Sequence, residues 1–422
     1  MPFLRLCYPS ITVIFPDVVI VGSGPAGTST ALHLLRADPA FAGNILILDK
    51  AIHPREKICA GGLIPHTLDC LKELDISLSV PHVQVDRAFV RVPPDRGVFC
   101  DDGGMCSVVR RNEFDFSLVQ AARARGVEIR EGEKVLELLP EKNGVRVITT
   151  KETYFPRIVV GADGSGSRVR RQLIGADDFA VGKAIMCDIP ATETSWPGFS
   201  QHRYDFNFLP VSQGLKGYVW EFPCVIHGEP HVNVGIYSLG DTRLSNAELQ
   251  WLLAQEVAKQ KLKVKSQKSA ISNSQPLAPG PKFRAFPICG YVPKRPLAAP
   301  HVVLVGDAAG AEPLMGEGIS FALEYGKFAA RAIRSALHTK QFDFADYTTT
   351  LVRSRLGKKL RRLHYTAKLF YGCTSPLWFT LAARSQRLQS VGLKWYNGVD
   401  GWHERSGWEA VWQILFSAKK ER

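Results

Sequence analysis

The sequence predicts an α/β fold: a nucleotide-binding domain around a parallel sheet, an inserted and mostly antiparallel β domain, and a helical C-terminal region. Buried-strand patterns that run into a glycine or an aspartate recur along the chain, at 18–21, 45–48, 157–160 and 301–305. A doubly wound sheet needs such widely separated strands. Residues 180–285 instead alternate strand-like runs with Pro and Gly, which indicates a second β layer. After Gly316 the pattern is mostly helical to the end.

The first strand runs into a glycine-rich turn, Gly22-x-Gly24-x-x-Gly27, that opens a helix. Gly22 permits the tight turn, Gly24 lets backbone approach a pyrophosphate, and Gly27 lets helix and strand pack closely. Pro25 suits the first helical turn, where its missing N–H leaves no bond unmade. The free N–H groups at this helix start favour an anion. Asp49, directly after the second strand, is placed to bind a ribose hydroxyl.

Between these strands, residues 113–125 predict a helix that stops at Gly126. The alternating runs 134–139 and 145–150 are joined by a turn containing Asn143-Gly144 and predict a small antiparallel layer.

Composition limits the class of protein. The 422 residues are 45% apolar and 22% charged, which excludes a disordered tail, a collagen and a small disulfide scaffold. No run of 18 or more apolar residues occurs, so the sequence predicts no membrane-spanning helix. Nine cysteines without a C-x-x-C pair, and histidines without metal-ligand spacing, predict reduced thiols, no metal site and a cytoplasmic location. Residues 1–15 are interpreted as an N-terminal extension, because no A-x-A-like cleavage site follows them.

Two later segments place an aspartate just past a buried strand: Val160-Gly-Ala-Asp163-Gly-Ser165 and Leu304-Val-Gly306-Asp307. Asp163 could equally cap the next helix. With the glycine-rich turn, these segments resemble the FAD-binding pattern of the flavoprotein superfamily that includes the aromatic hydroxylases, the halogenases and the geranylgeranyl reductases. The resemblance implies a Rossmann-like FAD-binding domain of the three-layer, glutathione-reductase type.

The same resemblance implies how FAD would be bound. Asp307 would bind the ribityl chain, and the backbone of 316–319 would lie beside the flavin ring, its helix N-terminus favouring the anionic reduced flavin. The segment Arg111-x-x-Phe114-Asp115-x-x-Leu118 also matches the superfamily, whose arginine contacts the cofactor; a solvated arginine at a helix start is the alternative. The implied cofactor-binding residues are Gly22, Ser23, Gly24, Pro25, Ala26, Gly27, Asp49, Lys50, Ala60, Gly61, Arg111, Val135, Asp163, Gly306, Asp307, Gly316, Gly318 and Ile319.

Two motifs resemble the geranylgeranyl reductase branch more closely. Lys57-Ile-Cys59-Ala60-Gly61-Gly62 is similar to that family's Lys-x-Cys-Gly-Gly pattern, although Ala60 stands where a glycine is usual. Tyr218-Val-Trp220-Glu-Phe222-Pro223 matches its Tyr-x-Trp-x-Phe-Pro motif, and halogenases carry a related one. In a strand the three aromatic side chains share one face. They would line a prenyl-lipid cavity, or form an ordinary core face.

The resemblance implies an FAD-dependent reductase that saturates C=C bonds of a geranylgeranyl-type chain by hydride transfer from reduced flavin. Cys59, or a water that it holds, is the candidate proton donor; a buried structural thiol is the alternative. A monooxygenase or halogenase acting on an apolar or aromatic molecule, and a non-catalytic FAD-bound membrane-associated factor, are alternative functions. The electron donor, NADPH or ferredoxin, stays open.

The C-terminal region has its own character. From residue 351 onward there are 14 Lys or Arg against 4 Asp or Glu, which gives +10 of the net +13. Five of the eight Trp also lie there. A basic, Trp-rich region suits peripheral contact with an anionic membrane, whereas a solvated helix face is the alternative. No nucleic-acid motif accompanies it, so we expect no nucleic-acid partner.

The predicted divisions of the chain are the extension 1–15, the FAD-binding domain 16–81, 109–179 and 286–340, the substrate β domain 82–108 and 180–285, and the C-terminal region 341–422.

Overall fold

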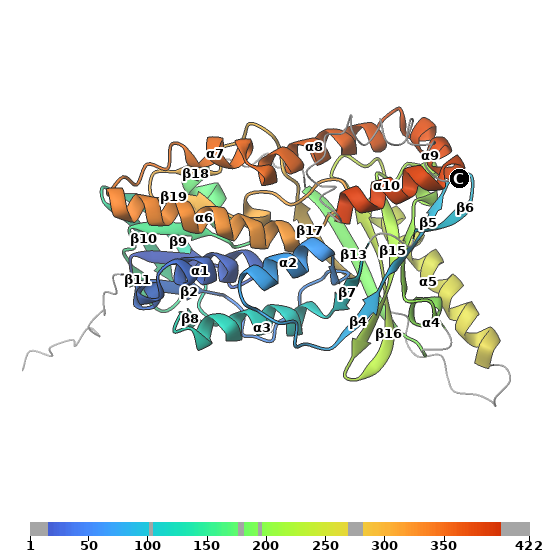
Figure 1. The fold of residues 1–422 in the computed structure, drawn as a ribbon, viewed down its shortest axis with the longest axis horizontal. Coiled ribbons are helices and arrows are strands. Elements are labelled where there is room, and N and C mark those ends of the chain that lie inside the picture. Colours follow the sequence, from blue (N-terminus) through green and yellow to red (C-terminus); the bar gives the residue numbers. More distant parts are fainter. Residues whose placement is uncertain (1–15, 101–103, 176–180, 193–195, 269–281, 398–422) are drawn as a thin grey trace, which may run out of the picture.

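The computed structural model describes residues 16–100, 104–175, 181–192, 196–268 and 282–397. The predicted N-terminal extension and the last 25 residues, 398–422, lie outside the described residues. Figure 1 shows the nucleotide-binding half on the left, the inserted β domain on the right, and the C-terminal helices across the top.

A six-stranded sheet in the order β18-β19-β12-β1-β2-β8 forms the centre of the nucleotide-binding half. Its strands are β1 (Val18–Val21), β2 (Ile45–Leu48), β8 (Glu128–Arg130), β12 (Ile158–Gly161), β18 (Ala298–Ala299) and β19 (Val302–Leu304). All neighbours pair in parallel except β18 with β19. Every residue of β1, β2, β12 and β19 is buried, which explains their continuous Val, Ile and Leu runs. The predicted Rossmann-type α/β fold is confirmed.

Three helices pack together beside this sheet: α1 (Pro25–Ala37), α3 (Arg111–Ala124) and α6 (Ile319–Thr339). The predicted antiparallel layer is β9 (Val135–Glu141), β10 (Gly144–Thr149) and β11 (Thr153–Tyr154), and β10 contacts β12. A short helix, α2 (Pro65–Glu73), packs on α6.

The inserted β domain is a seven-stranded sheet in the order β17-β13-β16-β15-β14-β5-β6. Its strands are β5 (Arg87–Val92), β6 (Arg96–Cys100), β13 (Val181–Pro190), β14 (Arg203–Asn207), β15 (Gly217–Ile226), β16 (Glu229–Ser238) and β17 (Arg284–Cys289). Only the β14–β5 pair is parallel. Helix α5 (Asn246–Lys268) contacts β13 and β16 and buries Leu249, Leu253 and Val257 against one face of the sheet. A one-turn helix, α4 (Pro197–Ser200), contacts β14 and β15.

The structure corrects two of the predicted domain boundaries. Strand β17 continues to Cys289 and pairs with β13, so the β domain does not end at 285. Within 82–108, only β5 and β6 join the large sheet; β4 (His82–Val85) and β7 (Cys106–Val109) pair with β3 (Gly62–Leu63) in a separate small sheet. Alternation of side chains marks a strand but does not identify its partner.

The predicted helical C-terminal region is confirmed for its described part. It contains α7 (Tyr347–Arg353), α8 (Arg355–Phe370), α9 (Ser375–Arg384) and α10 (Gln386–Asn397). On α8 the buried residues Leu356, Leu360, Leu363 and Ala367 recur at helical spacing. Helices α9 and α10 contact β5 and β6, so this region closes the open side of the β domain (Figure 1).

Candidate active site

A cavity of about 950 Å³ runs between the two halves of the molecule. One end is lined by the glycine-rich turn and the loops that follow the parallel strands, and the other by aromatic side chains of the β domain. Of the residues predicted to bind cofactor or substrate, all line it except Ser23, Gly27 and Gly306.

The glycine-rich turn has the geometry that its sequence predicts. Gly22 has a φ of +106°, and a Cβ there would lie 2.3 Å from the Ala162 oxygen. A Cβ on Gly27 would lie 2.0 Å from the Gly22 oxygen, which keeps α1 close to β1. Gly24 and Pro25 line the cavity, so the N-terminus of α1 faces it. This end of the cavity therefore favours an anionic group.

Ser23 does not line the cavity but hydrogen-bonds Asp49, which does. Its backbone N–H and its hydroxyl donate to Asp49 Oδ2 at 2.9 and 2.5 Å, and Ala51 N–H donates to Oδ1 at 2.9 Å. Burial alone would raise the pKa of Asp49, but these hydrogen bonds and the charge of Arg55 hold it below its ordinary value. Asp49 is thus an ionised acceptor at the cavity edge, as ribose binding requires.

Arg55 is a cavity residue that the sequence analysis missed. It follows β2 in a loop without a recognisable motif, and its guanidinium reaches Asp115 Oδ2 at 3.3 Å. Its Nη2 also lies 3.4 Å from the position of a Cβ on Gly24. The cation therefore stands beside the anion-favouring turn, where a pyrophosphate would need it.

Arg111 lines the cavity as predicted, but it does so while paired. Its Nε and Nη2 donate to the two carboxylate oxygens of Asp115 at 2.8 and 3.0 Å, and it also hydrogen-bonds Cys59. Asp115 is fully buried. The predicted alternative of a solvated arginine does not hold, because its side chain is 9% exposed.

Asp163 caps the turn that follows it, and it keeps one carboxylate oxygen at the cavity. Its Oδ2 accepts hydrogen bonds from the N–H groups of Arg168 and Val169 at 2.6 and 3.2 Å, which caps the following turn. Its Oδ1 is buried at the cavity without a hydrogen-bond partner among the described residues. Burial raises the pKa of Asp163. A ligand hydroxyl is the kind of group that would satisfy this oxygen.

At the predicted flavin-ring end of the cavity, a glutamate side chain lies at the start of α6. Gly316, Gly318 and Ile319 line the cavity, but the Glu317 carboxylate accepts the Ile319 and Ser320 N–H groups at 3.0 and 2.9 Å. Two N–H donors at the α6 N-terminus are therefore taken by a side chain of the protein itself. That this helix start favours an anionic flavin stays a prediction.

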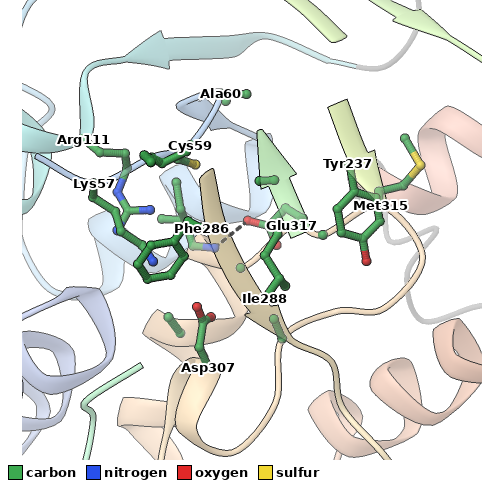
Figure 2. A pocket seen from close by; sticks show the side chains of 18 of the residues that line it. Lys57, Cys59, Ala60, Arg111, Tyr237, Phe286, Ile288, Asp307, Met315 and Glu317 are labelled. Atoms are coloured by element: carbon green, nitrogen blue, oxygen red, sulfur yellow. Dashed lines mark hydrogen bonds between the residues drawn. The ribbon is translucent and has the colours of Figure 1, made fainter. Parts of the chain in front are cut away.

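The cation at this end is Lys57. Figure 2 shows Lys57, Cys59 and Arg111 on one side of the cavity and Asp307 below them. The Lys57 ammonium lies 3.2 Å from the centre of the Phe286 ring. Burial lowers the pKa of Lys57 to about 8, although the charge of Asp307 opposes this. Its place in the Lys-x-Cys motif was the only signal for it, and that motif did not predict a role.

Cys59, Ala60 and Gly61 continue the loop along the cavity wall. The Cys59 sulfur accepts the Gly61 N–H at 3.4 Å and lies beside Arg111 (Figure 2). Gly61 has a φ of +81°, and a Cβ there would lie 1.9 Å from the Val109 oxygen, so this position requires glycine. The loop therefore holds a half-buried thiol at the cavity.

The apolar end is built from the predicted aromatic strand and from residues that the sequence did not predict. Tyr218, Trp220 and Phe222 of β15 face the cavity, together with Tyr204, Phe206 and Phe208. The Trp220 indole donates to Asn233 Oδ1 at 2.7 Å, and the Tyr218 hydroxyl donates to the Met315 oxygen at 2.6 Å. These bonds satisfy the polar atoms of the wall, so the surface offered to a ligand is apolar.

The C-terminal helices complete this end of the cavity. Their lining residues include Thr366 and Phe370 of α8, Trp378 and Ala382 of α9, and Leu393 and Tyr396 of α10. Lys50 and Val135, which were implied only by resemblance, line the opposite end.

A family model for the FAD-binding domain matches residues 16–333. The chain belongs to this FAD-binding domain family. It is accordingly an FAD-dependent oxidoreductase, and the residues present fit the cofactor: an anion-favouring helix start, an ionised Asp49 and an unsatisfied Asp163 oxygen.

Three curated relatives match most of the chain. An uncharacterized protein of Methanosarcina barkeri is 30% identical over 86% of each chain. A menaquinone reductase of Mycolicibacterium smegmatis is 27% identical over 90% of each chain. A digeranylgeranylglycerophospholipid reductase of Methanosphaera stadtmanae is 26% identical over 82% of this chain and 84% of the relative.

Two solved structures share the fold. A geranylgeranyl bacteriochlorophyll reductase-like protein from Thermoplasma acidophilum has a TM-score of 0.67 at 19% identity, over 97% of this chain and 98% of the other. A flavin-dependent brominase has a TM-score of 0.70 at 16% identity, over 95% and 98%. Reductases and halogenases thus share this architecture, and the fold does not separate their chemistries.

Proposed function

We propose that this FAD-dependent oxidoreductase saturates isolated C=C bonds of a prenyl chain. The observation that carries the proposal is the continuity of the cavity, which is lined at one end by the cofactor-facing loops and at the other by an aromatic wall. An unactivated alkene needs a dry site that holds it against the hydride donor, and Tyr218, Trp220 and Phe222 supply such a wall. The digeranylgeranyl group named in one relative supports this substrate class.

In the proposed arrangement, the α1 N-terminus and Arg55 bind the FAD pyrophosphate, Asp49 binds a ribose, and Asp307 binds the ribityl chain. Bound FAD, reduced by an external donor such as NADPH or ferredoxin, supplies hydride to one alkene carbon. The chain must then supply a proton to the other carbon. The proposed donor is Cys59, since Arg111 and the Gly61 N–H would both stabilise the anionic sulfur that proton transfer leaves.

Other hydroxyls at the cavity are less suited to this transfer. Tyr218 donates its proton to the Met315 oxygen, and Tyr237 donates to the Pro313 oxygen at 3.2 Å. Burial raises the pKa of both phenols well above the ordinary value. Their hydrogen bonds hold the loop 313–315 against the β domain instead.

The test is anaerobic. Purified protein is reduced with dithionite, geranylgeranyl diphosphate is added, and the flavin absorbance is followed. We expect reoxidation and a product heavier by two hydrogen atoms per reduced bond. A flavin that stays reduced with prenyl diphosphates and prenyl lipids, and reoxidises only with oxygen while product gains an oxygen or a halogen, would overturn the proposal in favour of monooxygenase or halogenase chemistry.

A further inference from the structure

The outer side of the C-terminal helices carries charge of one sign only. Residues 351–397 include ten Lys or Arg and no Asp or Glu. Among the cations whose burial the structure describes, six are exposed on α7, α8 and α9: Arg353, Arg355, Lys358, Arg361, Lys368 and Arg384. The region is therefore complementary to an anionic surface.

The same helices expose large apolar side chains. Tyr365 and Leu369 on α8 are each 53% exposed, and Leu377 and Leu381 on α9 are 57% and 43% exposed. Each pair is spaced by four residues, so each pair occupies one helix face. We call these four residues the α8–α9 surface. Isolated exposed apolar residues are common, but three leucines and a tyrosine on two packed helices amid cations are characteristic of interfacial helices.

This surface adjoins the wall of the cavity. In each helix the exposed pair lies one residue before the pair that lines the cavity: 365 and 369 before Thr366 and Phe370, and 377 and 381 before Trp378 and Ala382. Successive residues lie about 100° apart around a helix, so the exposed face and the cavity-lining face of each helix are neighbours. Phe370 and Phe379 meet at 4.7 Å between ring centres, and each contacts Phe208, at 5.7 and 5.6 Å. These aromatic rings form the joint between α8 and α9.

We propose that the α8–α9 surface docks on an anionic lipid bilayer and that a prenyl chain enters the cavity between α8 and α9. The entry step rests on the proposed function, whereas the docking step does not. A lipid substrate would then leave the bilayer without crossing water, because the docked surface and the cavity share the same two helices.

Charge distinguishes this occupant from the alternatives. A second copy of the same face would bring its six exposed cations against the same six cations, and such contacts repel. Residues 398–422 carry four acids and four cations, so this segment has no net charge to match the basic helices. An anionic bilayer matches both the cations and the apolar side chains.

The docking step is tested with full-length holoprotein and vesicles of phosphatidylcholine, alone or mixed equally with phosphatidylglycerol. Leu377→Asp combined with Leu381→Asp disrupts the surface, and Trp251→Asp is the matched control, because Trp251 is 58% exposed on α5 in the β domain. We expect sedimentation with the mixed vesicles, about tenfold weaker partitioning of the double variant, and no change in the control. Higher salt should weaken the binding.

Three results would overturn the docking step: no binding to mixed vesicles, equal binding of the double variant, or a dimer in solution that the double variant dissociates. Binding lost in a chain ending at residue 397, yet kept in the double variant, would assign the contact to 398–422 instead. The entry step predicts that the double variant reduces a detergent-dispersed prenyl substrate normally but a vesicle-embedded one slowly. Docking without any prenyl reduction would refute the proposed function and leave the docking surface standing.

Discussion

The substitution Lys57→Met is predicted to stabilise the protein from which FAD has been removed. Burial lowers the pKa of the Lys57 ammonium from 10.5 to about 8. At 1.36 kcal/mol per pKa unit, keeping this ammonium charged in the folded protein at neutral pH costs about 3 kcal/mol. Methionine would lose the attraction of the ammonium to the Phe286 ring, worth about 1 kcal/mol. The net expected gain in the free energy of unfolding is about 2 kcal/mol.

The pH dependence follows from the same pKa values. Between a folded pKa of about 8 and an unfolded pKa of 10.5, the unfolded chain binds more protons than the folded one. The charged Lys57 ammonium destabilises the folded protein fully below about pH 8. This destabilisation diminishes as the pH rises across the window. The advantage of Lys57→Met should accordingly be largest near neutral pH and decline as the pH rises towards 10.5.

Urea unfolding of the two deflavinated proteins, at neutral pH and at about pH 10, measures this difference. In the FAD-bound proteins the gain should shrink, because the negative charge of a cofactor in the same cavity would favour the ammonium. A Lys57→Met protein that is less stable than the parent without FAD at neutral pH would show that the ammonium is already paired within the chain. A stability difference that does not change with pH would show that charge is not its cause.

Three further predictions concern two residues that line the cavity, Gly22 and Cys59, and the buried Glu312 in the loop before Leu314. Gly22→Ala should abolish FAD retention on gel filtration, because its Cβ would lie 2.3 Å from the Ala162 oxygen at a φ of +106°. Cys59→Ser should slow prenyl reduction by about 10²–10⁴-fold if the thiol supplies the proton; dithionite reduction of the flavin should be unchanged, and an unchanged prenyl rate would exclude that role. Burial raises the pKa of Glu312 to about 7 from 4.5, so its contribution to stability, present below about pH 4.5, is lost as the pH rises through 7. Urea unfolding of Glu312→Gln against the parent should therefore show a stability difference that shifts in favour of the variant by up to about 3 kcal/mol across this window; a constant difference would refute it.

Local backbone patterns were the part of the structure that the sequence could predict. The Gly22 turn, the Asp after each buried strand and the aromatic face of β15 depend on spacing within a few residues, and the structure places them at one cavity. Arg55 and Phe206 could not be predicted, because a loop arginine or a strand phenylalanine acquires its role only from partners distant in sequence. The partner strands of β4, β7 and β17 were mispredicted for the same reason: pairing is a long-range property.

The C-terminal helices show how composition can indicate a surface and still leave its position unknown. Their cations and aromatic residues were evident in the sequence, yet nothing there indicated that Phe370 and Trp378 line the cavity. Helical spacing explains why one helix can both expose apolar residues and line the cavity. A helix with leucines at 377 and 381 and cavity residues at 378 and 382 presents two neighbouring apolar faces, and only packing decides which one is buried. Because the buried face meets the aromatic wall, the exposed face lies next to the apolar end of the proposed reaction site.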